Sequence, residues 1–239
     1  MRILLINPNS SPVMTRTIED AGKSVAAPGT EIVGCRPSGS PLSIEGHSDG
    51  VLAAYHTLKL VDESGPADGY VLACFDDTGV DALREKAAGP VLGIGEAAMH
   101  AATMLACRFS ILTSLERSVP ILEDNAARYG LTARCRGVHA AQLPVLAFED
   151  GESAYTTLRD AAGKVLETDR SDALVLGCGG MAHLAPRLAG ELGVPVVEGV
   201  ACAVKFVESL VSLGLGTSKA GGYAYPLAKK PASDGESHV

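Results

Sequence analysis

The sequence contains no tryptophan, and aromatic residues make up only 4% of its 239 residues, although 46% are hydrophobic. The core must therefore be built mainly from alanine, valine, leucine and isoleucine. No apolar run approaches the roughly 18–20 residues that a membrane-spanning helix requires. The first residues are those of a strand and lack the features of a signal peptide. We therefore expect a cytoplasmic protein without a membrane partner.

Clustered positive charge is also missing, since the net charge is −8, which argues against a nucleic-acid partner. Six cysteines are too few for a disulfide scaffold, and no cysteine pair or His/Asp/Glu cluster has the spacing of metal ligands. The glycine-rich motifs of nucleotide-binding loops are absent as well. The sequence therefore predicts neither a metal nor a cofactor.

Short apolar segments alternate with longer segments of helical character along the chain. Most of the apolar segments are continuous, which indicates strands that are buried on both faces of a parallel sheet. The alternation predicts an α/β fold with doubly wound parallel sheets. The predicted strands are Arg2–Asn7, Glu31–Arg36, Tyr70–Phe75, Val91–Ile94, Arg108–Leu112, Arg136–His139, Ala173–Leu176 and Val196–Glu198. The first helix is predicted to begin at Ser11-Pro12, and the others span Ser48–Glu63, Asp81–Ala88, Glu96–Leu105, Ser118–Tyr129, Glu152–Thr168, Met181–Leu192 and Ala201–Leu213.

An internal repeat relates the segments around Cys74 and Cys178. In each copy an apolar strand ends in a small residue and a cysteine, and a turn, a helix and a Pro-Val pair follow. In the sequence, Cys74 and Cys178 are separated by the same number of residues as Pro90 and Pro195, to within one residue. The repeat predicts two similar lobes with an active site in the cleft between them. We assign residues 1–96 and 209–228 to lobe 1 and residues 97–208 to lobe 2, and expect a disordered tail over 229–239.

Cys74 and Cys178 are the candidate catalytic residues. Ligands of open α/β sheets bind beyond the carboxyl ends of the strands, where both cysteines are expected. A thiol that directly precedes a helix should have a lowered pKa because it faces the positive end of the helix dipole. A single cysteine there would more often be a small core residue, but equivalent positions in a repeat favour catalysis. The remaining cysteines are interpreted as structural: Cys35, Cys107, Cys135 and Cys202.

Polar residues and glycines near the same edge are candidate substrate-binding residues. The backbone N–H groups of Gly179 and Gly180 could approach a ligand oxygen closely. The side chains of Asp76 and Asp77, and those of Thr113 and Ser114, could bind a ligand or merely cap helices. Asn9 and Ser10 could bind a ligand or belong to an ordinary turn. His183 is interpreted as a solvated or packed residue.

Five motifs together resemble the hydantoin racemases, a branch of the aspartate/glutamate/hydantoin racemase superfamily that includes allantoin racemases. They are Ile6–Ser10 with Met14-Thr15, Ala73–Asp81, Gly93–Ala98, Leu112–Leu115 and Gly177–Met181. The resemblance extends from about residue 1 to about residue 225. It implies a cofactor-independent isomerase with a small-molecule substrate and a homo-oligomeric state. Phe75 and Gly179-Gly180 replace polar residues of aspartate and glutamate racemases, which disfavours an amino-acid substrate.

The resemblance also implies that Cys74 and Cys178 are the two bases that racemise 5-monosubstituted hydantoins at C5. Backbone N–H groups at Asp76, Asp77, Gly179 and Gly180 would then stabilise the enolate oxygen. Ile44 and Phe75 suggest an apolar pocket for the C5 substituent. Allantoin racemisation is the nearest alternative. A two-lobed small-molecule binding protein, in which the paired cysteines are incidental, is an alternative of another class.

Overall fold

The computed structural model describes residues 1–149 and 151–229 and contains two four-stranded sheets. All strand pairs in both sheets are parallel, and the strand orders are β2-β1-β3-β4 and β6-β5-β7-β8. The two sheets therefore have the same connectivity, and the predicted α/β fold with doubly wound parallel sheets is confirmed. The strands are β1 Arg2–Ile6, β2 Glu31–Cys35, β3 Gly69–Leu72, β4 Val91–Gly93, β5 Phe109–Thr113, β6 Cys135–Ala140, β7 Ala173–Leu176 and β8 Val196–Val197.

Each predicted helix has a counterpart, but the segment after Cys178 differs from its prediction. The single helix expected over Met181–Leu192 is wrong, because a 3-10 helix over Gly179–Leu184 precedes α7. Pro186 lies in the first turn of α7, where its missing N–H is tolerated, and an α-helix cannot run through it without loss of a hydrogen bond. The α-helices are α1 Pro12–Val25, α2 His47–Glu63, α3 Val80–Lys86, α4 Ile94–Leu105, α5 Val119–Arg128, α6 Glu152–Asp169, α7 Ala185–Leu192 and α8 Gly199–Ser212, and the 3-10 helices are η1 Glu116–Ser118, η2 Val145–Glu149 and η3 Gly179–Leu184.

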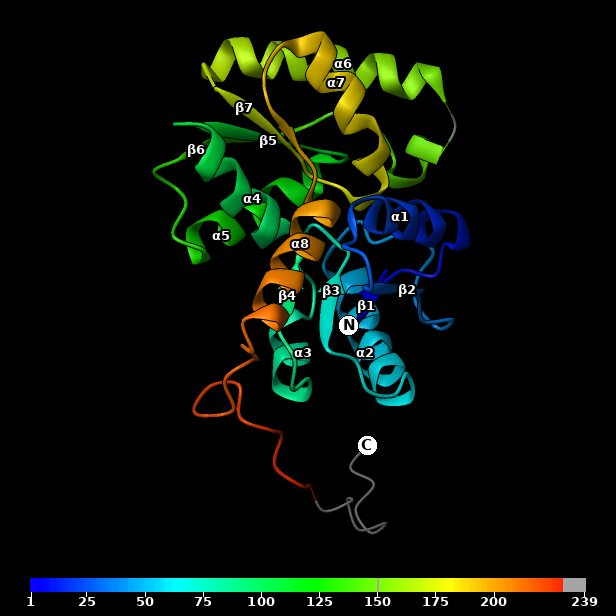
Figure 1. Ribbon diagram of the computed structural model, residues 1–239. Coiled ribbons are helices and arrows are strands. Elements are labelled where there is room, and N and C mark those ends of the chain that lie inside the picture. The colour runs from blue at the N-terminus through cyan, green and yellow to red at the C-terminus, as the bar shows by residue number, and fades with distance from the viewer. Residues whose placement is uncertain (150, 230–239) are drawn as a thin grey trace, which may run out of the picture.

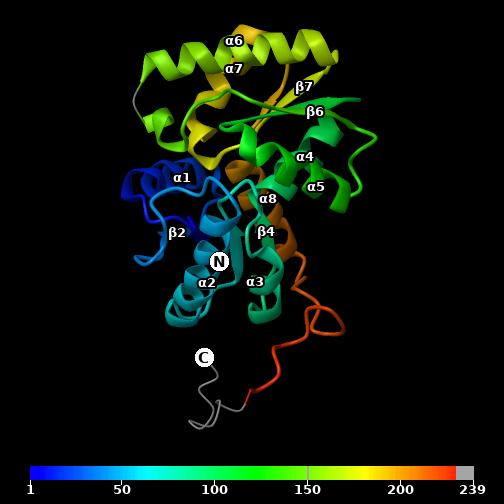
Figure 2. The same ribbon diagram turned by 180° about the vertical axis from the view of Figure 1, so that it is seen from behind.

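Helices cover both faces of each sheet. Figures 1 and 2 show α1, α4 and α8 between the two sheets, α2 and α3 on the outer side of the first sheet, and α6 and α7 on the outer side of the second. The side chains of β1 alternate accordingly, since Ile3 and Leu5 belong to the central core and Leu4 and Ile6 to the core under α2 and α3. This double burial explains why the strands are apolar at consecutive positions.

The predicted lobe boundaries fall inside two of the central helices. The boundary after Glu96 lies within α4, and the boundary before Ser209 lies within α8, and these helices pack against each other. The division of residues between two lobes therefore stays a prediction. The predicted disordered tail lies, apart from Lys229, outside the described residues. Within the described part of the chain, no helix is both long and apolar enough to cross a membrane.

Candidate active site

Cys74 and Cys178 line one small cavity at the carboxyl ends of β3 and β7. The cavity has a volume of about 40 Å³. The predicted site residues that the structure brings to its wall are Asn9, Ile44, Cys74, Phe75, Asp76, Thr113, Ser114, Cys178 and Gly179. Ser10, Asp77 and Gly180 do not line it. The wall also contains residues that the sequence analysis did not name as substrate-binding. Asn7 and Met14 belong to one of the quoted motifs, whereas Ser118 and Val145 belong to none.

Two glycines allow the turns that carry the cysteines to approach closely. A β-carbon at position 179 would lie 3.2 Å from the carbonyl oxygen of Ala73, the residue before Cys74. A β-carbon at position 177 would lie 2.8 Å from Cβ of Thr113, whose hydroxyl donates to the Gly177 carbonyl oxygen over 2.9 Å. Glycine at these positions therefore lets the end of β7 pack directly against the ends of β3 and β5.

The turn after β1 is held by its own side chains. The Asn7 amide donates to Oδ1 of Asn9 over 2.8 Å, and this oxygen also accepts the Ser11 N–H over 2.9 Å. The amide nitrogen of Asn9 lies 3.0 Å from the sulfur of Met14. Ser10 instead faces the loop before α2, because its N–H donates to the carbonyl oxygen of Pro41. Asn9 thus reaches the cavity and Ser10 does not.

Asp76 and Asp77 are adjacent in sequence but have different surroundings. The buried Asp77 carboxylate accepts the N–H groups of Gly95 at 3.0 Å and Glu96 at 2.8 Å, and the Tyr129 hydroxyl at 2.7 Å. Asp77 therefore caps the start of α4, and burial raises its pKa to about 7. Asp76 lines the cavity, and burial raises the pKa of its carboxyl group to about 6.

The expectation of lowered thiol pKa values is wrong for both cysteines. Burial raises the pKa of Cys178 to about 11, although the N–H groups of Gly180 and Met181 partly oppose the rise. Burial also raises the pKa of Cys74 well above its usual value, and the charge of Asp76 raises it further. The helix dipole does not act as expected, since α3 begins only at Val80 and the helix after Cys178 is a short 3-10 helix.

Most of the backbone N–H groups predicted to bind an enolate oxygen have other partners. The Asp77 N–H donates to the Cys74 carbonyl oxygen over 3.0 Å. The N–H groups of Asp76 and Gly180 bond to the thiols of Cys74 and Cys178, respectively. These three groups hold the cysteines in place instead of facing a ligand.

Glu45 and His47 also act on the site and were not identified from the sequence. One carboxylate oxygen of Glu45 accepts the N–H of Val145 over 3.4 Å, and its charge raises the pKa of Cys178. His47, in the first turn of α2, lowers the pKa of Asp76. No local motif marks either residue. Packing of the loop before α2 against η2 brings Glu45 near Cys178, and the start of α2 brings His47 near Asp76.

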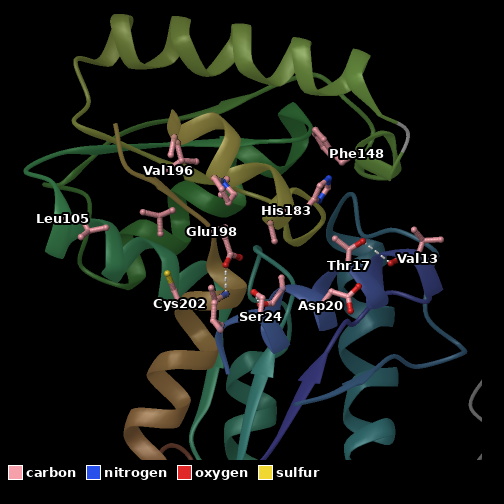
Figure 3. Close-up of a pocket in the computed structure, with 18 residues that line it drawn as sticks. Val13, Thr17, Asp20, Ser24, Leu105, Phe148, His183, Val196, Glu198 and Cys202 are labelled. Atoms are coloured by element: carbon pink, nitrogen blue, oxygen red, sulfur yellow. Dashed lines mark hydrogen bonds between the residues drawn. The ribbon is translucent and has the colours of Figure 1, made fainter. Parts of the chain in front are cut away.

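A larger cavity of about 780 Å³ lies between α1, α7 and the start of α8, and neither Cys74 nor Cys178 lines it (Figure 3). Its wall is mainly apolar, and the carboxylate of Glu198 is used to cap α8 through the N–H groups of Val200 and Ala201. His183 and Cys202 line this cavity rather than the smaller one. The larger cavity therefore contains neither of the two candidate cysteines. Among the described residues, no group of three or more His, Cys, Asp or Glu side chains could hold a metal ion.

Comparisons with known proteins agree on the family and differ on the substrate. The Asp/Glu/hydantoin racemase family matches residues 3–207. The hydantoin racemase of Paenarthrobacter aurescens is 42% identical over 96% of this chain and 99% of its own. A solved allantoin racemase from Klebsiella pneumoniae is 51% identical, with a TM-score of 0.93 over 98% of this chain and 97% of that chain. The glutamate racemase of Francisella tularensis, at 16% identity and a TM-score of 0.67 over 91% of this chain and 84% of that chain, shares the fold.

Proposed function

Because the chain belongs to the Asp/Glu/hydantoin racemase family, we propose that it racemises 5-monosubstituted hydantoins with the thiols of Cys74 and Cys178. The observation that carries the proposal is the meeting of two equivalent strand ends, each followed by a cysteine, at one cavity. Racemisation removes a proton from one face of a carbon and returns a proton to the other face. It therefore needs one acid–base group on each side, which is what paired cysteines from two sheets provide.

In the proposed reaction, the thiolate of one cysteine takes the C5 proton, and the electron pair moves onto the neighbouring ring carbonyl oxygen to form an enolate. The thiol of the other cysteine then donates its proton to the opposite face of C5 and becomes the thiolate. The substrate is inverted, and the two cysteines have exchanged roles. A thiolate is a strong base for this step because burial raises the pKa of both thiols, and only a small fraction of either thiol is ionised at neutral pH.

Allantoin is the second candidate substrate, since it is a hydantoin with a polar ureido group at C5. The 51% identity to a protein named allantoin racemase favours it, as do the polar side chains of Asn9 and Ser114 in the cavity wall. Ile44 and Phe75 in the same wall favour an apolar substituent. Cytoplasmic location and a homo-oligomeric state belong to the same proposal.

The test compares the loss of optical rotation of enantiopure L-5-benzylhydantoin and enantiopure allantoin with the purified protein. Racemisation of either one supports the proposed chemistry, and the ratio of the two kcat/KM values identifies the preferred substituent. Stable optical rotation of both compounds, with binding detected by calorimetry, would instead favour the alternative of a small-molecule binding protein.

A further inference from the structure

The Asp76 side chain lies at the boundary between the cysteine cavity and a second, outer pocket. The outer pocket has a volume of about 270 Å³ and includes His47 and Thr78. Among the described residues, Asp76 alone lines both. Its main chain is held in place, because the side-chain amide of Asn125 donates to the Asp76 carbonyl oxygen over 2.9 Å. The carboxyl group is thus presented to the cavity by a fixed turn.

Unlike its neighbour Asp77, the Asp76 carboxyl group has no hydrogen-bond partner among the described residues, whereas Asp77 has three. Other polar side chains of the cavity wall already donate, since the amide nitrogen of Asn9 contacts Met14 and the hydroxyl of Thr113 bonds to Gly177. A partly buried carboxyl group without partners is costly unless a ligand supplies the missing interaction.

The charged and titratable groups around Asp76 come from both halves of the molecule. His47 of α2 faces it, and the Asp76 carboxylate raises the pKa values of both Cys74 and Cys178. Asp77 adds negative charge near Cys74, and Glu45 adds negative charge near Cys178. A thiolate or an enolate in this cavity would therefore lie close to the Asp76 carboxylate in a poorly solvated space. Two negative groups so close together are unfavourable, so one of the two must keep a proton.

We propose that Asp76 acts in its neutral form and donates a hydrogen bond to the ring oxygen that becomes negative when C5 loses its proton. This role rests on the proposed function. The proton balance is closed within the site. The C5 proton moves to one sulfur, the other sulfur supplies the proton to the opposite face, and Asp76 keeps its own proton throughout. Asp76 thereby takes the role that the sequence analysis gave to four backbone N–H groups, three of which instead bond to the cysteines.

This role has a signature in the pH dependence of kcat/KM. The active form has a neutral Asp76 and one thiolate. It carries the same number of protons as the form with an ionised Asp76 and two thiols, so the ratio of these two forms does not change with pH. The wild-type kcat/KM should therefore rise through the Asp76 pKa of about 6 and stay level to about pH 9. In Asp76→Asn the charge must come from a thiol that ionises to solvent. Its kcat/KM should rise about tenfold per pH unit from pH 6.5 to 9.

The experiment measures kcat/KM from pH 5 to 10 for wild type, Asp76→Asn, Asp76→Ala and Ser114→Ala, with whichever substrate the wild type racemises. At pH 7 we expect kcat/KM of Asp76→Ala to be about 100-fold or more below that of Asp76→Asn, because alanine removes the oxyanion donor and the asparagine amide can still donate. Asp76→Ala should show the same sloping profile if Asp76→Asn does not fold. Ser114→Ala removes a hydroxyl from the same cavity without removing an ionisable group, so any loss should leave the wild-type profile shape unchanged.

An Asp76→Asn profile of wild-type shape, or equal kcat/KM values for Asp76→Asn and Asp76→Ala at pH 7, would overturn the role of Asp76 while leaving the racemase proposal intact. Absence of racemisation by the wild type would overturn the proposed function itself, and the role of Asp76 with it.

Discussion

Two thiols in equivalent backbone positions differ in their electrostatic surroundings. Cys74 lies beside the carboxylates of Asp76 and Asp77, which raise its pKa in addition to burial. Cys178 receives N–H groups from Gly180 and Met181, which lower its pKa relative to what burial alone would produce. The two cysteines are therefore not electrostatically equivalent, although their backbone positions are.

We expect Cys74→Ala and Cys178→Ala each to lower racemisation in both directions by at least about 100-fold, because each removes the acid–base group on one face of C5. In D2O each variant should still exchange the C5 proton of one enantiomer, and the two variants should prefer opposite hands. NMR of the C5–H signal with each enantiomer measures this. Cys202→Ala is the matched control, since that cysteine lies outside the cavity, and it should racemise like wild type. Exchange of the same enantiomer by both variants would place the two thiols on one face of the substrate.

At the scale of elements, the cavity is closed by segments from both halves of the chain. Its volume of about 40 Å³ is close to that of a single water molecule, and known ligand pockets are about 300–1,000 Å³. Two of these segments are the loop before α2, in which Ile44 lines the cavity and Glu45 follows, and η2, in which Val145 lines it. These two segments are joined by the hydrogen bond between Glu45 and the Val145 N–H. We therefore expect that these two segments move apart when a substrate binds.

The contact between the turns after β3 and β7 sets the spacing of the two cysteines. In Gly179→Ala the new methyl group would meet the Ala73 carbonyl oxygen at 3.2 Å and Cδ1 of Ile94 at 3.3 Å, so the turns must shift by a few tenths of an ångström. We expect kcat/KM to fall about tenfold, because acid–base catalysis depends steeply on position. The free energy of unfolding should fall by about 1 kcal/mol.

Gly190→Ala is the matched control, because Gly190 lies in α7 with no atom within 4 Å of the new methyl group. It should leave kcat/KM unchanged and stabilise the protein by up to about 1 kcal/mol through helix propensity. Steady-state kinetics and urea unfolding measure both effects. Equal kinetics for the two alanine variants would show that the spacing of the turns tolerates the added methyl group.

At the scale of the whole molecule, the Tyr129 hydroxyl connects the end of α5 to Asp77 after β3. The folded-state pKa of Asp77 is about 7, above the value of about 3.9 for an unfolded chain. As pH rises, the carboxyl group therefore ionises in the unfolded state before it ionises in the folded state. Because of this group, the free energy of unfolding falls as pH rises from about 4 to 7. The Tyr129 hydroxyl opposes this effect, because its hydrogen bond lowers the pKa of Asp77.

Tyr129→Phe should lower the free energy of unfolding by about 1.5–3 kcal/mol at pH 8, as for a hydrogen bond to an ionised group. At pH 5 the loss should be smaller, because Asp77 is then protonated in the folded protein. Urea unfolding at both pH values measures the difference. Tyr225→Phe is the control, since the Tyr225 hydroxyl makes no hydrogen bond within the described residues, and it should change little at either pH. A loss for Tyr129→Phe that is larger at pH 5 would contradict this assignment.

The sequence by itself determined the strands, their parallel arrangement and the equivalence of Cys74 and Cys178. These features depend on local patterns: a strand buried on both faces needs consecutive apolar residues, as in Ile3–Ile6, and a repeat preserves the spacing of its turns. Only the tertiary structure decided the direction of the thiol pKa shifts, the capping of α4 by Asp77 and the approach of Glu45 and His47. Burial and charge depend on side chains that are distant in sequence, so no local pattern could reveal them.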